Sequence, residues 1–584
     1  MSKNQGKQEQ AEVFKPYLSM ATALRERFRE SYTMSDLRAD LLAGFVVGMV
    51  AIPLGMALAI ATGVPPQYGL YTVVLGGLVA LLGGSRFSVT GPTAAFVVIL
   101  APIVHQHGLS GLLMASAIAG VILFFLGATR LGQVITFIPY PVTTGFTSGI
   151  AVVIAVIQIK DFFGLKIDHL PDPFFERIAA LIKSAGTFSL SELGISSLTL
   201  GLLALWPRIN KRIPSPIVVL SLITVLAYVL KQAFPSLEIA TIRDRFSYMD
   251  GGILKHGIPS ALPMFSLPWN FNGSSFDLNM TNLQAVSLAG FAIALLGAIE
   301  SLLCAVVADG ITQTKHDPNA ELLALGIGNI VGPFFGAIPA TGAIVRTATN
   351  IRFGARSPLA AIFHAIIVLL IIVFTADYVS YVPMSALAGL LMYVSYGMFD
   401  SKHFFHCIKL SPRSDRTVLL TCFTLTVCFD MVVGVTIGVV LAALLFIQRM
   451  SYVTTGSAIM GAHHKLPEQL PEGIMVYEIA GPLFFGAAQR AIEGAKVANK
   501  TIKSVVFNFE NVPTMDLTGL IAFESAVLEL KNRDISIHIS NVSPQPLKLL
   551  SRSKVLRSNP QIHIESTLKQ ALGYAKTDLL KTLI

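Results

Sequence analysis

The chain has 584 residues, of which 53% are hydrophobic and only 13% are charged. With a mean hydropathy of +0.66, this composition excludes a soluble globular protein and is typical of a protein with many membrane spans. The net charge of +9 does not indicate a nucleic-acid partner, because the lysines and arginines lie in many short loops and not on one amphipathic face.

The chain begins with a polar, basic leader, residues 1–38, which lacks the apolar core of a cleavable signal peptide. We identify about fourteen apolar segments beyond it, given that a span needs roughly 17 to 25 residues, or fewer where the helix is broken. The predicted spans are 40–62, 68–84, 88–104, 111–128, 133–158, 194–207, 214–231, 284–308, 320–335, 340–351, 359–375, 380–397, 417–430 and 432–448.

Two short spans, the third and the tenth, are interrupted by the Thr-Gly pairs Thr90-Gly91 and Thr341-Gly342. Broken spans in corresponding halves of a transporter usually hold the substrate. A helix that begins inside the membrane directs free amides and the positive end of its dipole at a ligand, which favours an anion. The expected anion-binding residues are Thr90, Gly91, Thr93, Thr341, Gly342, Ala343, Ile344, Val345 and Arg346. The alternative is that the Thr-Gly pairs only relieve helix packing.

Two ionisable side chains lie at membrane depth, where their cost indicates a function. Arg346 follows the second break and would add a fixed positive charge, although a short helix could also let it snorkel to the interface. Glu300 lies near the middle of the eighth span and is the expected coupling residue. It would take up a proton, with sodium as the rival ion, or it would only pair with Arg346 or hydrogen-bond a backbone break.

The loop charges agree with this span count. Starting from a cytoplasmic leader, the loops predicted to be cytoplasmic hold Arg86, Arg130, Arg208, Lys211, Arg212, Lys315, Arg352, Arg356 and the basic segment 402–416, as the positive-inside rule requires. Fourteen spans divide into two sets of seven, and an odd number per set makes the repeats inverted. We therefore expect 7+7 inverted repeats, with both termini cytoplasmic.

The composition changes after Gln448, and residues 451–472 read as a polar linker. Beyond it, strands are predicted at 474–479, 504–509 and 535–539, and a helix at 517–530. This pattern predicts a small soluble α/β domain. The expected domains are the leader 1–38, the transmembrane domain 39–450, the linker 451–472 and the α/β domain 473–584.

The four cysteines, Cys304, Cys407, Cys422 and Cys428, have neither disulfide nor zinc spacing. The histidines His403, His406, His463 and His464 are expected in solvated loops. No cofactor, metal site or nucleophile–base pair is predicted, so we do not expect an enzyme.

Several motifs resemble the SulP family of anion transporters, the sulfate permease group. They are 51–59 (AIPLGMALA), 63–71 (GVPPQYGLY), 88–93 (SVTGPT), 297–303 (GAIESLL), 314–316 (TKH), 328–330 (GNI) and 338–346 (IPATGAIVR). The turn at 512–519 (VPTMDLTG) resembles a STAS domain. The segments 83–88 (GGSRFS), 145–149 (GFTSG) and 158–162 (QIKDF) are most similar to the bacterial branch that includes a C4-dicarboxylate transporter.

The resemblance implies a core domain and a gate domain, with the substrate between the facing ends of the third and tenth spans. It also implies an elevator-like movement of the core, a homodimer, and an acidic residue at position 300. Thr518 stands where phosphorylatable STAS domains carry a serine, so it is a possible phosphosite. A helix N-cap is the alternative role for Thr518.

The leading hypothesis is a secondary active symporter of small anions, with a C4-dicarboxylate such as succinate ahead of sulfate and bicarbonate, and with a proton ahead of sodium. A nucleobase permease is disfavoured by Arg346 and by the appended STAS domain. The hypothesis from another class is a membrane-anchored scaffold whose STAS domain recruits a cytoplasmic protein partner. The intact Glu300 and Arg346 disfavour it.

Overall fold

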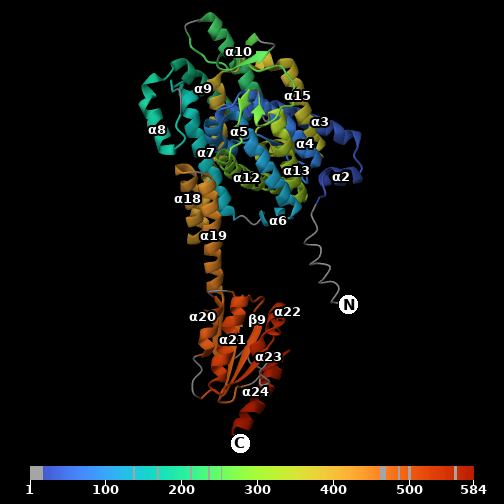
Figure 1. The fold of residues 1–584 in the computed structure, drawn as a ribbon, viewed down its shortest axis with the longest axis vertical. Coiled ribbons are helices and arrows are strands. Elements are labelled where there is room, and N and C mark those ends of the chain that lie inside the picture. Colours follow the sequence, from blue (N-terminus) through green and yellow to red (C-terminus); the bar gives the residue numbers. More distant parts are fainter. Residues whose placement is uncertain are drawn as a thin grey trace. The chain divides into compact units, whose positions relative to one another are not determined.

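The computed structural model describes residues 18–135, 139–167, 170–210, 213–234, 237–250, 253–271, 273–429, 431–460, 469–484, 487–496, 501–557 and 562–583 (Figure 1). The chain divides into two compact units, Met1–Val439 and Val440–Ile584. The second predicted histidine pair, His463 and His464, lies outside the described residues, as do Lys211 and Arg212.

The first unit consists of two helical bundles. The core bundle contains α3 (Met34–Thr62), α4 (Pro66–Leu82), α5 (Ala94–Ala128), α12 (Met280–Thr312), α13 (Pro318–Val331), α14 (Ile344–Arg352) and α15 (Leu359–Val379). The gate bundle contains α7 (Tyr140–Phe163), α9 (Leu190–Ile209), α10 (Ser215–Ala233), α16 (Met384–Met398), α18 (Arg413–Cys428) and the first part of α19 (Met431–Val453). The core and gate predicted from the resemblance are therefore present as separate packing groups.

Every predicted span overlaps one of these helices. Within the described residues, eight helices are long and apolar enough to cross a membrane. One of them, α5, covers the third and fourth predicted spans, and the two spans meet at a kink where Gly108 has a non-helical backbone with a φ of 65°. The predicted multi-span fold is thus confirmed, although several spans are short helices that depend on packing against neighbours.

The two broken spans begin later than predicted. The residues before α5 and α14 are extended and form two short strands, β1 (Thr90–Gly91) and β6 (Thr341–Gly342). Pro92 lacks an amide hydrogen and biases the preceding glycine away from helix, which delays the first turn of α5. The helices therefore begin several residues inside the predicted spans, at Ala94 and Ile344.

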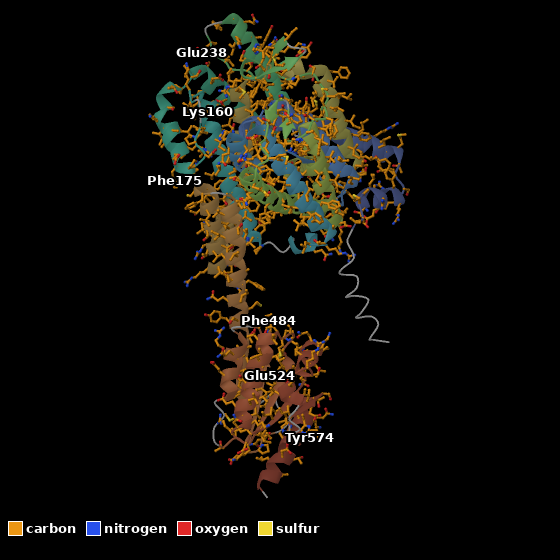
Figure 2. All side chains as sticks on the ribbon, in the orientation of Figure 1. Lys160, Phe175, Glu238, Phe484, Glu524 and Tyr574 are labelled. Atoms are coloured by element: carbon orange, nitrogen blue, oxygen red, sulfur yellow. The ribbon has the colours of Figure 1, made fainter. Side chains whose placement is uncertain are left out.

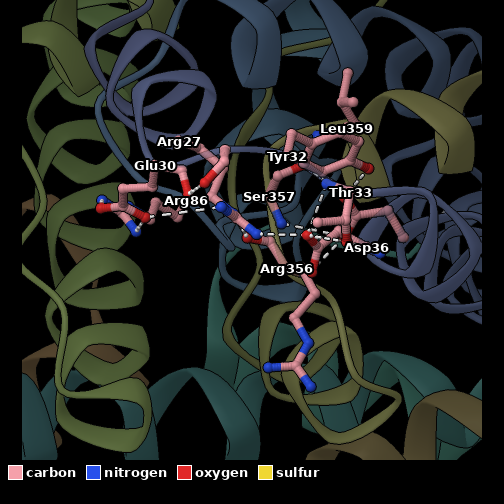
Figure 3. A network of polar contacts seen from close by, with 11 residues as sticks. Arg27, Glu30, Tyr32, Thr33, Asp36, Arg86, Arg356, Ser357 and Leu359 are labelled. Atoms are coloured by element: carbon pink, nitrogen blue, oxygen red, sulfur yellow. Dashed lines mark hydrogen bonds and ion pairs between the residues drawn. The ribbon is translucent and has the colours of Figure 1, made fainter.

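Several segments with predicted inner-loop arginines meet at one end of the core bundle. The short helix α2 (Thr22–Arg29) lies against the loops around residues 86 and 356, and we call this contact the N-terminal clamp (Figure 3). Arg27 donates from Nε to the Arg356 carbonyl at 3.2 Å, and Arg86 pairs with Glu30 at 2.5 Å. The clamp places the leader and these two loops on one side of the unit, as the charge pattern predicts.

Asp40 secures the same end from inside the fold. Its carboxylate accepts hydrogen bonds from the amides of Arg356 and Ser357, at 2.6 and 3.1 Å, and from the Tyr32 hydroxyl at 2.7 Å. These bonds satisfy the backbone where the chain enters α15. A buried aspartate in an apolar helix is explained here by structure and not by transport.

The loops and span ends of the first unit also contain short elements, most of them in segments where no helix or strand was predicted. They are α6 (Gly132–Ile135), α8 (Phe174–Lys183), η1 (Ala185–Thr187), α11 (Ile242–Arg245), β2 (Ser247–Asp250), β3 (Ile253–His256), β4 (Asn270–Phe271), β5 (Ser274–Ser275), η2 (Gly332–Phe335) and α17 (Ser401–Leu410). Phe175 projects from α8 with 67% of its surface exposed (Figure 2).

The second unit is an α/β domain built on one five-stranded sheet of order β11-β10-β9-β8-β7. The strands are β7 (Thr455–Ile459), β8 (Ile474–Ala480), β9 (Ser504–Asn511), β10 (Ser536–Ser540) and β11 (Ile562–Glu565), parallel except for β7. The helices α20 (Ala487–Lys496), α21 (Leu517–Lys531), α22 (Pro544–Leu550) and α23 (Lys554–Arg557) share one apolar core, and α24 (Leu568–Leu583) covers a second one.

The predicted linker 451–472 needs correction. Helix α19 continues to Val453, and β7 follows almost at once and pairs antiparallel with β8. The short sequence of β7 is exposed along most of its length, so it carries little of the apolar signal by which strands are predicted. The sheet therefore starts inside the segment that reads as a linker.

Candidate functional site

The two Thr-Gly breaks lie side by side in the core bundle. Strands β1 and β6 pair antiparallel, with Thr90 opposite Gly342 and Gly91 opposite Thr341. Each strand runs into a helix start, α5 after Thr93 and α14 after Ala343, and neither of these cap residues makes a side-chain capping bond. Two helix N-termini with uncapped first turns thus flank one short ladder, and such termini attract negative charge.

The first break is supported mainly by α14. The Val89 amide donates to the Thr347 hydroxyl at 2.9 Å, and the Asn350 side-chain amide donates to the Phe87 carbonyl at 3.0 Å. The Ala343 amide donates to the Val89 carbonyl at 2.9 Å. Because these groups are buried, each bond satisfies a backbone atom that would otherwise be costly to desolvate.

The second break is supported by α4, α12 and α13. The Ile338 amide donates to the Thr72 hydroxyl at 2.8 Å. The Asn329 side chain accepts from the Ala340 amide and donates to the Ala340 carbonyl, both at 2.9 Å. The Thr341 hydroxyl donates to the Gly297 carbonyl at 2.9 Å. These supporting residues, Thr72, Asn329, Thr347 and Asn350, were not predicted from the sequence. For Thr72 and Asn329 a signal was available, since each is a polar side chain within a mostly apolar helix, whereas α14 is polar along much of its length.

Arg346 is almost completely buried, with 1% of its surface exposed. Its Nη2 atom donates to the Pro92 carbonyl, and its guanidinium lies against Gly91, where an added Cβ would come within 2.5 Å of Nη1. The Nε and Nη1 groups have no hydrogen-bond partner among the described residues. Arg352 and Arg356 are exposed, so they, and not Arg346, fit the snorkelling role.

Glu300 reaches the first break from α12. Its Oε2 atom accepts a hydrogen bond from the Thr93 hydroxyl at 2.9 Å, and the residue is only partly buried. Among the ion pairs between described residues, none joins Glu300 to Arg346. The sequence left open whether Glu300 pairs with Arg346 or contacts a broken segment. The structure shows the contact with the first broken segment.

The structure brings the predicted anion-binding residues together around β1 and β6. Thr90 and Thr341 are buried in the ladder, whereas Ile344 and Val345 are 37% and 60% exposed at the start of α14. The site therefore presents backbone amides and apolar side chains, with the Arg346 charge behind Gly91 and Pro92. Such a surface can bind an anion through dipoles and one buried cation.

A separate apolar crevice of about 830 Å³ lies between α3 and α15 of the core and α10 of the gate. It is lined by residues such as Phe45, Met49, Leu220 and Ile371, and no charged side chain lines it. Its apolar lining makes it a poor anion site, so the starts of α5 and α14 remain the candidate site. The described residues contain no cluster of three metal-ligating side chains.

Thr518 lies in the second unit, exposed at the start of α21. The capping role proposed as its alternative belongs to Asp516, whose carboxylate accepts from the Gly519 amide at 2.7 Å. Asp516 is the better cap because an ionised carboxylate at an N-terminus also benefits from the helix dipole. Phosphorylation of Thr518 stays a prediction.

Two family matches cover most of the chain. The Sulfate permease family matches residues 37–422, and the STAS domain matches residues 467–571. The chain is 37% identical to the Bacillus subtilis protein named "Putative sulfate transporter YvdB", over 86% of this chain and 91% of that protein. It is 29% identical to the "Bicarbonate transporter BicA" of Picosynechococcus, over 90% and 92% of the two chains.

Solved structures share the fold. A murine Slc26a9 anion transporter in the inward-facing state superposes with a TM-score of 0.82 at 18% identity, covering 95% of this chain and 94% of that one. The transmembrane domain of a cyanobacterial bicarbonate transporter, BicA, gives a TM-score of 0.58 at 26% identity, covering 70% and 98%. The first likeness extends over both units and therefore includes the α/β domain.

Proposed function

Because the chain belongs to the sulfate permease family, we propose that it is a secondary active transporter of small oxyanions, with sulfate first and bicarbonate second. At the coarser level it is a multi-pass membrane anion transporter with a C-terminal STAS domain, and it is not an enzyme. The expected preference for a C4-dicarboxylate such as succinate finds no support among these relatives, whose names refer to sulfate and bicarbonate.

One observation carries the proposal: two uncapped helix starts, α5 and α14, are held together by the β1–β6 ladder beside a buried arginine. Backbone amides at helix starts bind an oxyanion without needing an exposed cation, and the buried Arg346 charge strengthens the positive potential there. Bicarbonate is kept as the second candidate because a bicarbonate transporter shares the transmembrane fold at 26% identity.

A cation is proposed to enter with the anion at Glu300. The carboxyl is partly buried and bonded to Thr93 at the start of α5. A lone carboxylate in a low-dielectric setting favours a proton or a bound cation over remaining bare. We keep both ions, because a carboxyl next to a hydroxyl suits protonation and also offers the oxygen ligands that sodium uses.

The remaining proposals follow from the two-bundle arrangement. The core bundle carries both broken segments, so its movement against the gate bundle would carry the site across the membrane. The elevator-like mechanism, the homodimer, the bacterial inner membrane and the cytoplasmic position of both termini are proposed on the family resemblance and the charge pattern. A cytoplasmic partner of the STAS domain is proposed on the same ground.

Uptake into proteoliposomes tests the function. Purified full-length protein is assayed with radiolabelled sulfate, bicarbonate and succinate, under imposed proton or sodium gradients. We expect sulfate or bicarbonate to accumulate with one of the two cations. Preferential accumulation of succinate would restore the dicarboxylate hypothesis, and failure of folded protein to transport any of the three would favour the scaffold.

A further inference from the structure

Thr93 occupies an unusual position at the start of α5. A threonine at a helix N-cap normally accepts a hydrogen bond from an amide of its own first turn. Thr93 makes no such bond, and its hydroxyl is instead turned to α12, where it donates to Oε2 of Glu300 at 2.9 Å. The hydroxyl therefore touches the proposed cation residue while belonging to the proposed anion-binding segment.

The direction of this hydrogen bond depends on whether Glu300 is ionised. A threonine hydroxyl has one hydrogen to donate, and an ionised carboxylate can only accept. While Glu300 is ionised and bare, that hydrogen points to Glu300, and the hydroxyl presents only lone pairs to its other surroundings. Lone pairs facing an anion are repulsive, so the first half of the site is then unfavourable for the anion.

Neutralising Glu300 reverses the direction of the hydroxyl. A protonated Glu300 can donate to the Thr93 oxygen, and a cation held by the Glu300 carboxylate can take the same oxygen as a ligand. In both cases the Thr93 hydrogen is released and can turn to the anion. With a proton, the same two oxygens stay hydrogen-bonded, but the hydrogen between them now belongs to Glu300. With a cation, the ion bridges the two oxygens.

From this geometry we infer that the Thr93 hydroxyl is a two-position donor that makes anion affinity depend on occupation of Glu300 by a cation. The inference rests on the proposed function and names how its cation and anion are linked. Other ionisable groups near Glu300 are Cys304 one turn along α12, Arg346 behind Gly91 and Pro92, and Glu321, whose carboxylate lies 3.5 Å from the Ser301 hydroxyl. Among the described residues, none of these three hydrogen-bonds Glu300, so Thr93 is its direct link to the broken segment.

The test is equilibrium binding of radiolabelled sulfate, and separately of bicarbonate, to the full-length protein in detergent. Binding is measured with and without sodium and at acid and alkaline pH. The variants are Thr93→Ser, which keeps the hydroxyl, Thr93→Val, which removes it, and Glu300→Gln, whose amide can donate to Thr93 as a neutral acid would. Thr349→Val is the matched control, because the Thr349 hydroxyl bonds only its own helix at the Val345 carbonyl.

We expect the cation to raise anion affinity about tenfold in the wild type and in Thr93→Ser, the size of one hydrogen bond to a charged group. Thr93→Val loses that increase, and Thr349→Val keeps it. Glu300→Gln binds the anion without a cation as tightly as the wild type does with one, and this gain disappears in the double variant with Thr93→Val.

The inference is overturned if Thr93→Val keeps the full cation dependence, or if Glu300→Gln binds no more tightly than the cation-free wild type. The second criterion does not need the valine variant to fold. Failure of the proposed function is a different result and is visible in the wild type alone, as the absence of any sulfate, bicarbonate or succinate binding by folded protein.

Discussion

The two broken segments of the core bundle have the same backbone plan and different chemistry. Both consist of a Thr-Gly strand followed by an uncapped helix start, and each is the other's only strand partner in their two-stranded ladder. The first segment offers the Thr93 hydroxyl and reaches Glu300, whereas the second carries Arg346 and exposes Ile344 and Val345.

This difference suggests that anion binding and cation coupling depend on different residues of the proposed site. In the proposed site, the backbone amides of both halves would attract the anion almost equally, since helix dipoles depend on helix direction and not on side chains. The fixed charge of Arg346 is carried by α14 but lies against Gly91 and Pro92 of the first half. Glu300, the proposed coupling residue, also contacts the first half, through Thr93. One pseudo-symmetric frame can therefore hold an anion while only one of its halves responds to a cation.

The largest effect is expected from Arg346→Ala, which removes the charge of the second half. Transport should fall about 100-fold or more, as for the loss of a buried cation worth several hydrogen bonds. Uptake of sulfate and the midpoint of thermal unfolding are measured together. The truncation leaves the buried Pro92 carbonyl without its donor, so the free energy of unfolding should fall by about 1–3 kcal/mol. A much larger loss of stability would give Arg346 a structural role.

Glu300→Gln should remove accumulation while leaving anion binding intact. The amide cannot ionise, so the cation gradient no longer drives the cycle. Concentrative uptake is compared with exchange of labelled for unlabelled sulfate in the same vesicles. Unchanged accumulation would show that Glu300 does not couple the cation to the anion, and the proposed difference between the two halves would then be wrong.

The paired variants Gly91→Ala and Gly342→Ala compare the two ladder positions directly. A Cβ at 91 would lie 2.5 Å from Nη1 of Arg346, and one at 342 would lie 3.0 Å from the Cα of Ser301. We expect Gly91→Ala to reduce anion affinity about tenfold by displacing the charge, and Gly342→Ala to cost about 1 kcal/mol of stability through crowding of α12. Equal effects on affinity would argue that Arg346 does not act through Gly91.

The smallest effects are expected from Thr347→Val and Thr72→Val, which each remove the acceptor of one buried backbone amide, Val89 or Ile338. Each should lower the free energy of unfolding by about 1–3 kcal/mol. Similar losses in thermal or denaturant unfolding would indicate that the two broken segments are stabilised equally by their supporting hydrogen bonds. A loss confined to one variant would place most of the rigidity in that half.

Much of the fold was predictable because long apolar segments and inner-loop arginines follow directly from the bilayer as solvent. The breaks at Thr90-Gly91 and Thr341-Gly342 were visible for the same reason. The pairing of β1 with β6, and the bond between Thr93 and Glu300, join residues more than 200 positions apart, and no local pattern encodes them. The sheet strand β7 was missed because it is short and exposed.

The N-terminal clamp has a mechanical consequence. Helix α2 is fastened to the loops that precede β1 and α15, all of them belonging to the core bundle. If the core bundle moves against the gate bundle, as proposed, a force applied to α2 would reach the moving bundle and not the gate bundle. A partner that held α2 in place would therefore restrain the proposed movement of the core bundle.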